Sequence, residues 1–282
     1  ASPRRPDPIV ADIRPPYRIP LLVLGFASLI VGVGAGLLRL GWAMPRPAAD
    51  LAAFHGPLMV CGFFGTVISL ERAVALARRW AYLGPLAAGA GGLSLILGAP
   101  LAVAQLLLAL GSAVLLAGSV SVFLRQRALF TFTLAAGAGC WLAGNLLWLA
   151  GQSVFAVVPW WAGFLVLTIA GERLELTRFL PTPAVAQRLF FAIVGGILAG
   201  AVLSFWQEDA GLALFSAGLL ALAVWLLRYD IANMTLQVSG GKFYEVDAFL
   251  TYRIANPKLF RERALGDLRT VDGVDRGELG VE

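Results

Sequence analysis

The chain has 282 residues, of which 59% are hydrophobic and 14% charged, and its formal net charge is +5. A mean hydropathy of +0.80 is too high for a globular protein, which must cover its surface with polar groups. Water is therefore not the main solvent of this chain. The basic pI of about 9.7 comes from Arg residues that flank apolar runs, where they act as topology signals, so nucleic acid is not an expected partner.

The first 18 residues contain five Pro and no apolar core. This composition predicts a disordered cytoplasmic arm over residues 1–18, without a cleavable secretory signal. The first apolar run, which follows the arm, is therefore expected to act as its own targeting signal.

Apolar runs of about 20 residues follow one another from residue 19 to residue 228, and a helix of this length crosses a hydrocarbon core of about 30 Å. The runs do not alternate in polarity, which argues against the strands of a β-barrel. Abundant Gly favours closely packed helices. The prediction is an all-α, polytopic transmembrane helical bundle in a lipid bilayer, with about eight spans at residues 19–41, 51–75, 81–99, 101–124, 128–150, 155–177, 185–206 and 210–228.

Basic residues cluster at alternate span ends: Arg4, Arg5, Arg14, Arg18, Arg72, Arg78, Arg79, Arg125, Arg127, Arg173, Arg178, Arg188 and Arg228. The opposite loops at residues 98–100 and 151–158 carry no positive charge, and residues 208–209 are acidic. Only Arg39 and Arg46 run against the trend. Because positive residues favour the cytoplasmic side during insertion, the pattern predicts a bacterial inner-membrane protein with both termini in the cytoplasm.

An internal repeat is a further expectation. The second span ends in Gly65–Arg72 and the sixth in Leu165–Arg173, and each stretch closes with Glu-Arg at the predicted cytoplasmic boundary. The fourth and eighth spans likewise end in Leu-Arg, at Arg125 and Arg228. Two four-helix halves in parallel orientation would produce this spacing, and chance similarity among Leu- and Ala-rich helices is the alternative.

The composition becomes charged and soluble after the last span, which predicts a cytoplasmic, partly disordered tail over residues 229–282. Alternation within Tyr244–Ile254 predicts one strand. The run Val246–Phe260 is similar to a strand-and-turn piece of the stomatin/prohibitin-type domain of membrane protease regulators. It is too short to close a core, so it indicates at most a fragment of that domain.

His55 is the only histidine of the chain and lies near the predicted outer end of the second span. An ionisable side chain at this depth is a functional candidate. Met59 lies four residues on, on the same helical face, so that a nitrogen and a thioether would suit copper or one axial side of a haem. In the simpler interpretation, His55 donates to a backbone carbonyl and Met59 packs against neighbouring helices.

A second set of candidates is ionic. Glu-Arg pairs close the second and sixth spans, and they predict a cluster that either clamps the two halves together or lines an ion path: Glu71, Arg72, Glu172, Arg173 and Glu175. In the simpler interpretation, the Arg residues of these pairs are insertion signals, and the neighbouring Glu residues lie in the aqueous interface. Asn145 is the other deep polar side chain, for which we expect a partner on a neighbouring helix.

Three motifs together resemble one known family. They are His55–Leu76, Val166–Leu176 and Trp225–Asp230. They are similar to motifs of the NnrS-like bacterial membrane proteins, a poorly characterised family associated with haem, copper and nitric-oxide stress. The similarity covers about residues 19–236. Family members continue through more spans with further histidines, so the resemblance implies a truncated member in which only His55 matches.

The leading hypothesis is therefore an NnrS-like inner-membrane protein with a copper or haem contact at His55 and Met59. A transporter of small solutes or ions is an alternative, with a water-accessible cavity lined by Asn145, Glu71 or Glu172. A non-catalytic subunit of a larger membrane complex is another, with membrane-protein partners on the lipid-facing helices. The chain contains no phosphate loop, catalytic triad or zinc-type Cys/His spacing, so nothing commits it to an enzyme reaction.

Overall fold

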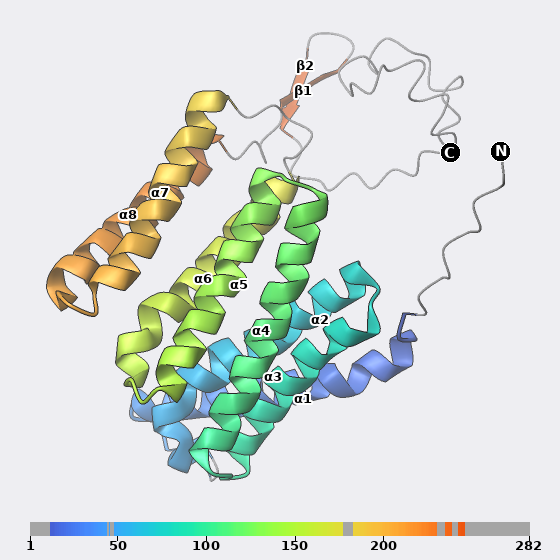
Figure 1. Ribbon diagram of the computed structural model, residues 1–282, viewed down its shortest axis with the longest axis vertical. Helices are drawn as coiled ribbons and strands as arrows, with labels where there is room; N and C mark the ends of the chain where they lie inside the picture. The colour runs from blue at the N-terminus through green and yellow to red at the C-terminus, as the bar shows by residue number, and fades with distance from the viewer. Residues whose placement is uncertain are drawn as a thin grey trace. The chain divides into compact units, whose positions relative to one another are not determined.

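The computed structural model describes residues 12–43, 45, 48–176, 183–229, 235–238 and 242–245 (Figure 1). The chain divides into two units, a helical one at residues 1–230 and a second one at residues 231–282. The described part of the first unit is an all-α bundle. Its eight helices are α1 (Ile19–Arg39), α2 (Gly65–Leu76), α3 (Leu83–Ile96), α4 (Leu101–Arg125), α5 (Leu129–Leu149), α6 (Val154–Leu176), α7 (Ala184–Leu203) and α8 (Glu208–Tyr229).

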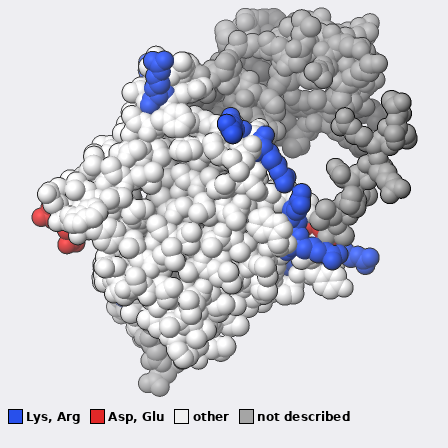
Figure 2. All heavy atoms as spheres, viewed as in Figure 1, with Lys and Arg blue, Asp and Glu red and all other residues white. Residues whose placement is uncertain are grey.

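Seven helical stretches among the described residues are long and apolar enough to cross a membrane. The protein is therefore a multi-pass membrane protein, as the hydropathy predicts. The face drawn in Figure 2 is mostly uncharged, and most of its visible Lys and Arg atoms lie along one edge. A surface of this kind suits a lipid bilayer, with charges left at the polar boundary.

The third helix is shorter than the predicted span at residues 81–99. It has 14 residues, so it is about 21 Å long at 1.5 Å per residue. A 3-10 turn at Arg79–Tyr82 takes up the beginning of the run, and Gly98, at φ +69°, ends it. α3 packs against α1, α2 and α4 through small side chains, so it still occupies the place of a span within the bundle.

The second predicted span is not a uniform α-helix. A 3-10 helix at Ala48–Phe54 leads into a π-helix at Pro57–Phe64, and only then does α2 begin. Pro57 has no N–H to donate, and its ring crowds the preceding turn, which is a physical reason for the change in winding. π-helical turns are rare and occur frequently at functional sites.

Glycines bring α1, the π-helix and α3 into close contact. Ser28 of α1 fits between Gly62 and Gly92, since a Cβ on Gly62 would lie 2.7 Å from its hydroxyl oxygen and one on Gly92 closer still. Gly89 similarly receives the Leu24 side chain, 2.7 Å from where a Cβ would be. These contacts have the close backbone approach that small residues allow between membrane helices.

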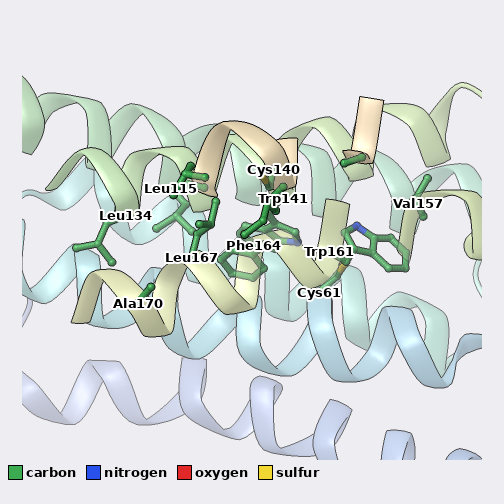
Figure 3. Packing of buried hydrophobic residues seen from close by; sticks show 14 of the residues in the cluster. Cys61, Leu115, Leu134, Cys140, Trp141, Val157, Trp161, Phe164, Leu167 and Ala170 are labelled. Atoms are coloured by element: carbon green, nitrogen blue, oxygen red, sulfur yellow. The ribbon is translucent and has the colours of Figure 1, made fainter. Parts of the chain in front are cut away.

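The largest buried side chains lie between α5 and α6. Trp141 and Phe164 stack with ring centroids 5.0 Å apart and planes at 12°, and both are inaccessible to solvent. Figure 3 shows this pair next to Cys61 and Trp161. Gly65 on α2 lies against the Trp141 ring, so α2 closes over the same core. The core therefore joins helices from both halves of the chain.

The two four-helix halves do not pack alike. In the first half, α3 contacts both α1 and α2, whereas α7 contacts α8 extensively and α6 only slightly. The α7–α8 hairpin is held by Gly200 against the Phe215 backbone and by the Trp225 indole, which donates to the carbonyl of Ala186 at 2.9 Å. The packing thus gives no support to the predicted internal repeat.

Residues 12–18 of the N-terminal arm, for which the sequence predicts disorder, are described by the structure. Pro15–Arg18 form a 3-10 turn that runs into α1. The Asp12 carboxylate accepts hydrogen bonds from Arg18 at 2.6 Å and from the Tyr82 hydroxyl at 2.8 Å. Two partners on separate elements hold this segment against the beginning of α3.

In the second unit, two strands form an antiparallel hairpin, β1 (Thr235–Val238) and β2 (Lys242–Glu245), with Thr235 opposite Glu245. The tail was expected to contain one strand at Tyr244–Ile254. The described strand begins earlier, and the rest of the predicted one lies outside the described residues, as does the stomatin-like stretch Val246–Phe260.

Candidate functional site

His55 lies where the 3-10 helix meets the π-helix, and its ring faces α1. Its Nδ1 is 2.8 Å from the carbonyl oxygen of Gly32. A carbonyl oxygen only accepts, so Nδ1 must carry the proton. In the neutral ring, Nε2 then keeps its lone pair free for a ligand, and histidines that bind metals are oriented by a hydrogen bond of this kind.

Gly36 makes room for the His55 ring. A Cβ at Gly36 would lie 2.8 Å from both Nδ1 and Cε1 of the imidazole, closer than real Cβ contacts occur. One turn earlier on α1, a Cβ at Gly32 would lie 3.0 Å from the Met59 sulfur. His55 and Met59 therefore meet the same glycine face of α1, as their spacing in the sequence indicates.

A shallow, open hollow of about 380 Å³ adjoins the imidazole. We call it the His55 hollow, and it is lined by Val33, Gly36, Leu37, Arg39, Leu40 and His55. Its volume is at the lower end of the range for small-molecule sites, and its walls are mostly apolar with two convergent polar groups. Met59 does not line it. The His55 hollow thus offers one ligating nitrogen and no thioether.

The predicted ionic cluster is assembled in part. Arg72 of α2 and Glu172 of α6 approach with Nη2 and Oε1 3.9 Å apart. The two side chains are 15% and 41% exposed, and the Arg72 Nε is buried without a partner. Glu71 and Glu175 lie near enough to repel Glu172. This is a loose ion pair between helices of the two halves.

Arg173 and Glu175 of the same predicted cluster also take part in interactions and are not free. The structure therefore joins the two predicted Glu-Arg pairs through Arg72 and Glu172.

Asn145 forms a fully buried hydrogen-bonded junction. Its Oδ1 accepts from the Trp161 indole at 3.1 Å and from the Cys61 thiol at 3.3 Å. Its Nδ2 donates to the Leu108 carbonyl at 3.1 Å and to the Ser112 hydroxyl at 3.2 Å. The amide has thus used every hydrogen-bonding position, joining the π-helix, α4, α5 and α6. We call this group the Asn145 junction.

The sequence did not place Arg39 beside His55, whereas both line the His55 hollow. The available signal in the sequence is that Arg39 lies at the end of its span where the other loops lack basic residues. Cys61 lies in the same apolar run as His55, and its thiol donates to the Asn145 side chain. Trp161 is 2% exposed and belongs to the Asn145 junction.

The family model described as Domain of unknown function (DUF8744) matches residues 18–252. The chain belongs to this family. The match covers the whole bundle and continues through the β1–β2 hairpin, so the DUF8744 region includes both the His55 hollow and the strands. No curated protein and no solved structure matches the chain.

Proposed function

We propose that this DUF8744 protein is a membrane-embedded haem-binding protein in which Nε2 of His55 is the single axial ligand. The observation that supports the proposal best is the hydrogen bond from Nδ1 to the Gly32 carbonyl, which leaves Nε2 with the lone pair. The resemblance to NnrS-like proteins, carried by the motif around His55, points to the same ligand.

The residues around His55 suit a haem better than a copper ion. Cu(I) prefers several soft ligands, and Met59 packs against Gly32 and not in the His55 hollow. Within the part of the chain that the structure describes, no group of three His, Cys, Asp or Glu side chains is placed to hold a metal ion. A porphyrin supplies four of its own nitrogens, so a single imidazole and apolar walls from Val33, Leu37 and Leu40 are enough to complete the site.

Bound haem would supply an iron centre for diatomic gases or for electron transfer. The protein's own residues would do three things. His55 would ligate through Nε2, the Gly32 carbonyl would fix the ring orientation, and the leucines would shield one side of the ligand from water. Gly36 is required because any larger residue would push the imidazole out of place.

The transporter hypothesis has less support. It needs a wet cavity lined by deep polar groups, and Asn145 is inaccessible with its amide fully hydrogen-bonded. The Arg72–Glu172 pair lies at the end of the bundle and is not connected to the Asn145 junction by any hydrogen bond among the described residues.

We also propose an orientation with both termini in the cytoplasm of a bacterial inner membrane, which places the His55 hollow at the opposite face. The basic residues at the beginning of α1 and at the ends of α2, α4, α6 and α8 support this orientation. It requires α3 to cross the membrane. Reporter fusions in the loop at residues 98–100 test it, and a cytoplasmic reporter signal there would contradict it.

The haem proposal is tested by titrating the purified protein in detergent with hemin and following the Soret band. Wild type should bind stoichiometrically, and His55→Ala should lose at least about tenfold in affinity, with partial rescue by added imidazole. Met59→Leu is the matched control, since it keeps the volume and removes only the sulfur. It should bind hemin like wild type. Equal binding by wild type and His55→Ala would overturn the proposal.

A further inference from the structure

Arg39 is the second polar residue of the His55 hollow, and its position calls for an explanation. It lies in the last turn of α1, is exposed, and lines the same hollow as the imidazole. No ion pair to Arg39 is found among residues 12–43, 45, 48–176 and 183–229, so no described acidic side chain neutralises it.

Topology does not explain this charge. Arg39 lies at the end of the bundle where the loops at residues 97–100 and 150–153 carry no positive charge, and a basic residue there opposes the preferred direction of insertion. A cation near a helix C-terminus does interact favourably with the helix dipole. The helices α3, α5 and α7, which also end at this side, have no basic residue in their last turns. The dipole therefore does not require one.

The walls of the His55 hollow indicate what would neutralise Arg39. Val33, Leu37 and Leu40 line the hollow together with His55 and Arg39. A ligand that contacts all of these residues needs an apolar body, an atom that accepts the Nε2 lone pair and an acidic group at its edge. Arg binds carboxylates through two parallel N–H donors, and such charge-assisted bonds are about twice as strong as neutral ones.

We propose that Arg39 binds a carboxylate of the ligand held by His55, so that the His55 hollow selects amphipathic macrocycles that carry acid groups. This inference rests on the proposed function. It adds a selectivity that His55 alone does not supply, because an imidazole binds an iron porphyrin whether its edge is acidic or esterified. Hemin, with two propionates, has the required groups, and a bare metal ion does not.

The test compares hemin with its dimethyl ester, in which both carboxylates are blocked. The full-length protein in detergent is titrated with each compound as wild type, Arg39→Gln and Arg39→Lys. Arg127→Gln is the matched control, since Arg127 is equally exposed but lies between α4 and α5. Arg39→Gln should weaken hemin binding about tenfold and leave binding of the ester unchanged. Arg39→Lys keeps the charge but loses the two parallel N–H donors, so its hemin affinity should be intermediate. Arg127→Gln should bind hemin like wild type.

Four results would contradict the inference. If Arg39→Gln weakens acid and ester alike, Arg39 only maintains the shape of the hollow. If it weakens neither, Arg39 faces the phosphates of lipid headgroups. If wild type binds neither compound, the proposed function fails and this inference with it. A wild type that binds both compounds equally, with His55→Ala binding neither, would leave the proposed function standing and contradict the role of Arg39 alone.

Discussion

The Asn145 junction and the His55 hollow are both polar sites in an apolar bundle, but they differ in how their hydrogen-bonding capacity is used. Asn145 is fully buried, and its amide makes four hydrogen bonds. His55 is partly exposed, makes one hydrogen bond through Nδ1 and borders an open hollow. Polar groups at membrane depth are costly, so each must have a partner or a function.

The difference suggests how structural and functional polar residues can be told apart in this family. A side chain whose donors and acceptors are all occupied by neighbouring helices serves packing. A side chain that is oriented by one bond, with a second atom left available, can bind a ligand. By this criterion Asn145 serves packing and His55 is the candidate ligand. Substitutions at Asn145 should mainly lower stability, and substitutions at His55 should mainly lower the proposed ligand binding.

The largest effect on stability is expected for Asn145→Leu. The substitution keeps a similar volume but leaves the Trp161 indole and the Cys61 thiol without their acceptor, whereas the Ser112 hydroxyl keeps its bond to the Ala109 carbonyl. We expect the free energy of unfolding to fall by about 2 to 4 kcal/mol, since each buried unpaired group costs about 1 to 3 kcal/mol. The loss is limited because the hydrogen bonds of membrane helices are partly replaced by other partners in the unfolded state. Thermal unfolding in detergent measures it. Leu146→Ala, at a side chain that is 49% exposed, is the control and should change little. Wild-type stability in Asn145→Leu would contradict a structural role.

A second prediction separates ligand binding from folding. Gly36→Ala places a methyl group 2.8 Å from the imidazole, so the ring must rotate away from the Gly32 carbonyl. Hemin affinity should fall by about tenfold or more, while the free energy of unfolding falls by only about 1 to 2 kcal/mol. Gly195→Ala is the matched control, because no atom lies within 4 Å of its Cβ position. It should alter neither quantity measurably, and a loss of hemin binding in both variants would count against the site.

The Arg72–Glu172 pair should contribute less. Its atoms are 3.9 Å apart, and Glu172 is 41% exposed, so solvent screens the attraction. A double-mutant cycle with Arg72→Gln and Glu172→Gln should give a coupling energy below about 1 kcal/mol. Several kcal/mol of coupling would instead indicate a clamp between the two halves.

The smallest effect concerns the N-terminal segment. Burial, together with the neighbouring Asp12 carboxylate, raises the pKa of the Tyr82 hydroxyl. The stability linked to this shift is therefore fully present below the ordinary tyrosine pKa of about 10, and it is lost as the pH rises through the higher pKa of the folded state. Asp12→Asn should lower the Tyr82 pKa. Ultraviolet titration of the wild type and of Asp12→Asn, each compared with its Tyr82→Phe derivative, isolates the Tyr82 signal. An unchanged pKa would mean that Asp12 does not act on Tyr82.

The helices were largely predictable because bilayer thickness sets the length of each apolar run. α4 and α5 begin and end within a residue or so of the predicted spans. The 3-10 and π-helical parts of the second span were not predicted, since they depend on how Pro57 is accommodated against α1. Residue spacing could not predict the partners of Asn145 either, because Leu108 and Trp161 come from other helices.

The candidate site was predictable in part for similar reasons. A single histidine in an apolar run identified His55, and helical spacing placed Met59 on the same face. The separation of Met59 from the His55 hollow follows from the close approach of α1 at Gly32, which only the packing reveals. Arg39 and His55 lie on different helical elements, so no motif could have joined them.

The central claim is that Nε2 of His55 carries a free lone pair. Because the chain has one histidine, ring-labelled ¹⁵N-histidine gives a single pair of nitrogen signals that needs no assignment among residues. At a pH where the ring is neutral, we expect one nitrogen, Nδ1, to be protonated and the other, Nε2, to be unprotonated, with the Nε2 signal lost or strongly shifted when hemin is added. A proton on Nε2, or an Nε2 signal that hemin leaves unchanged, would contradict the account.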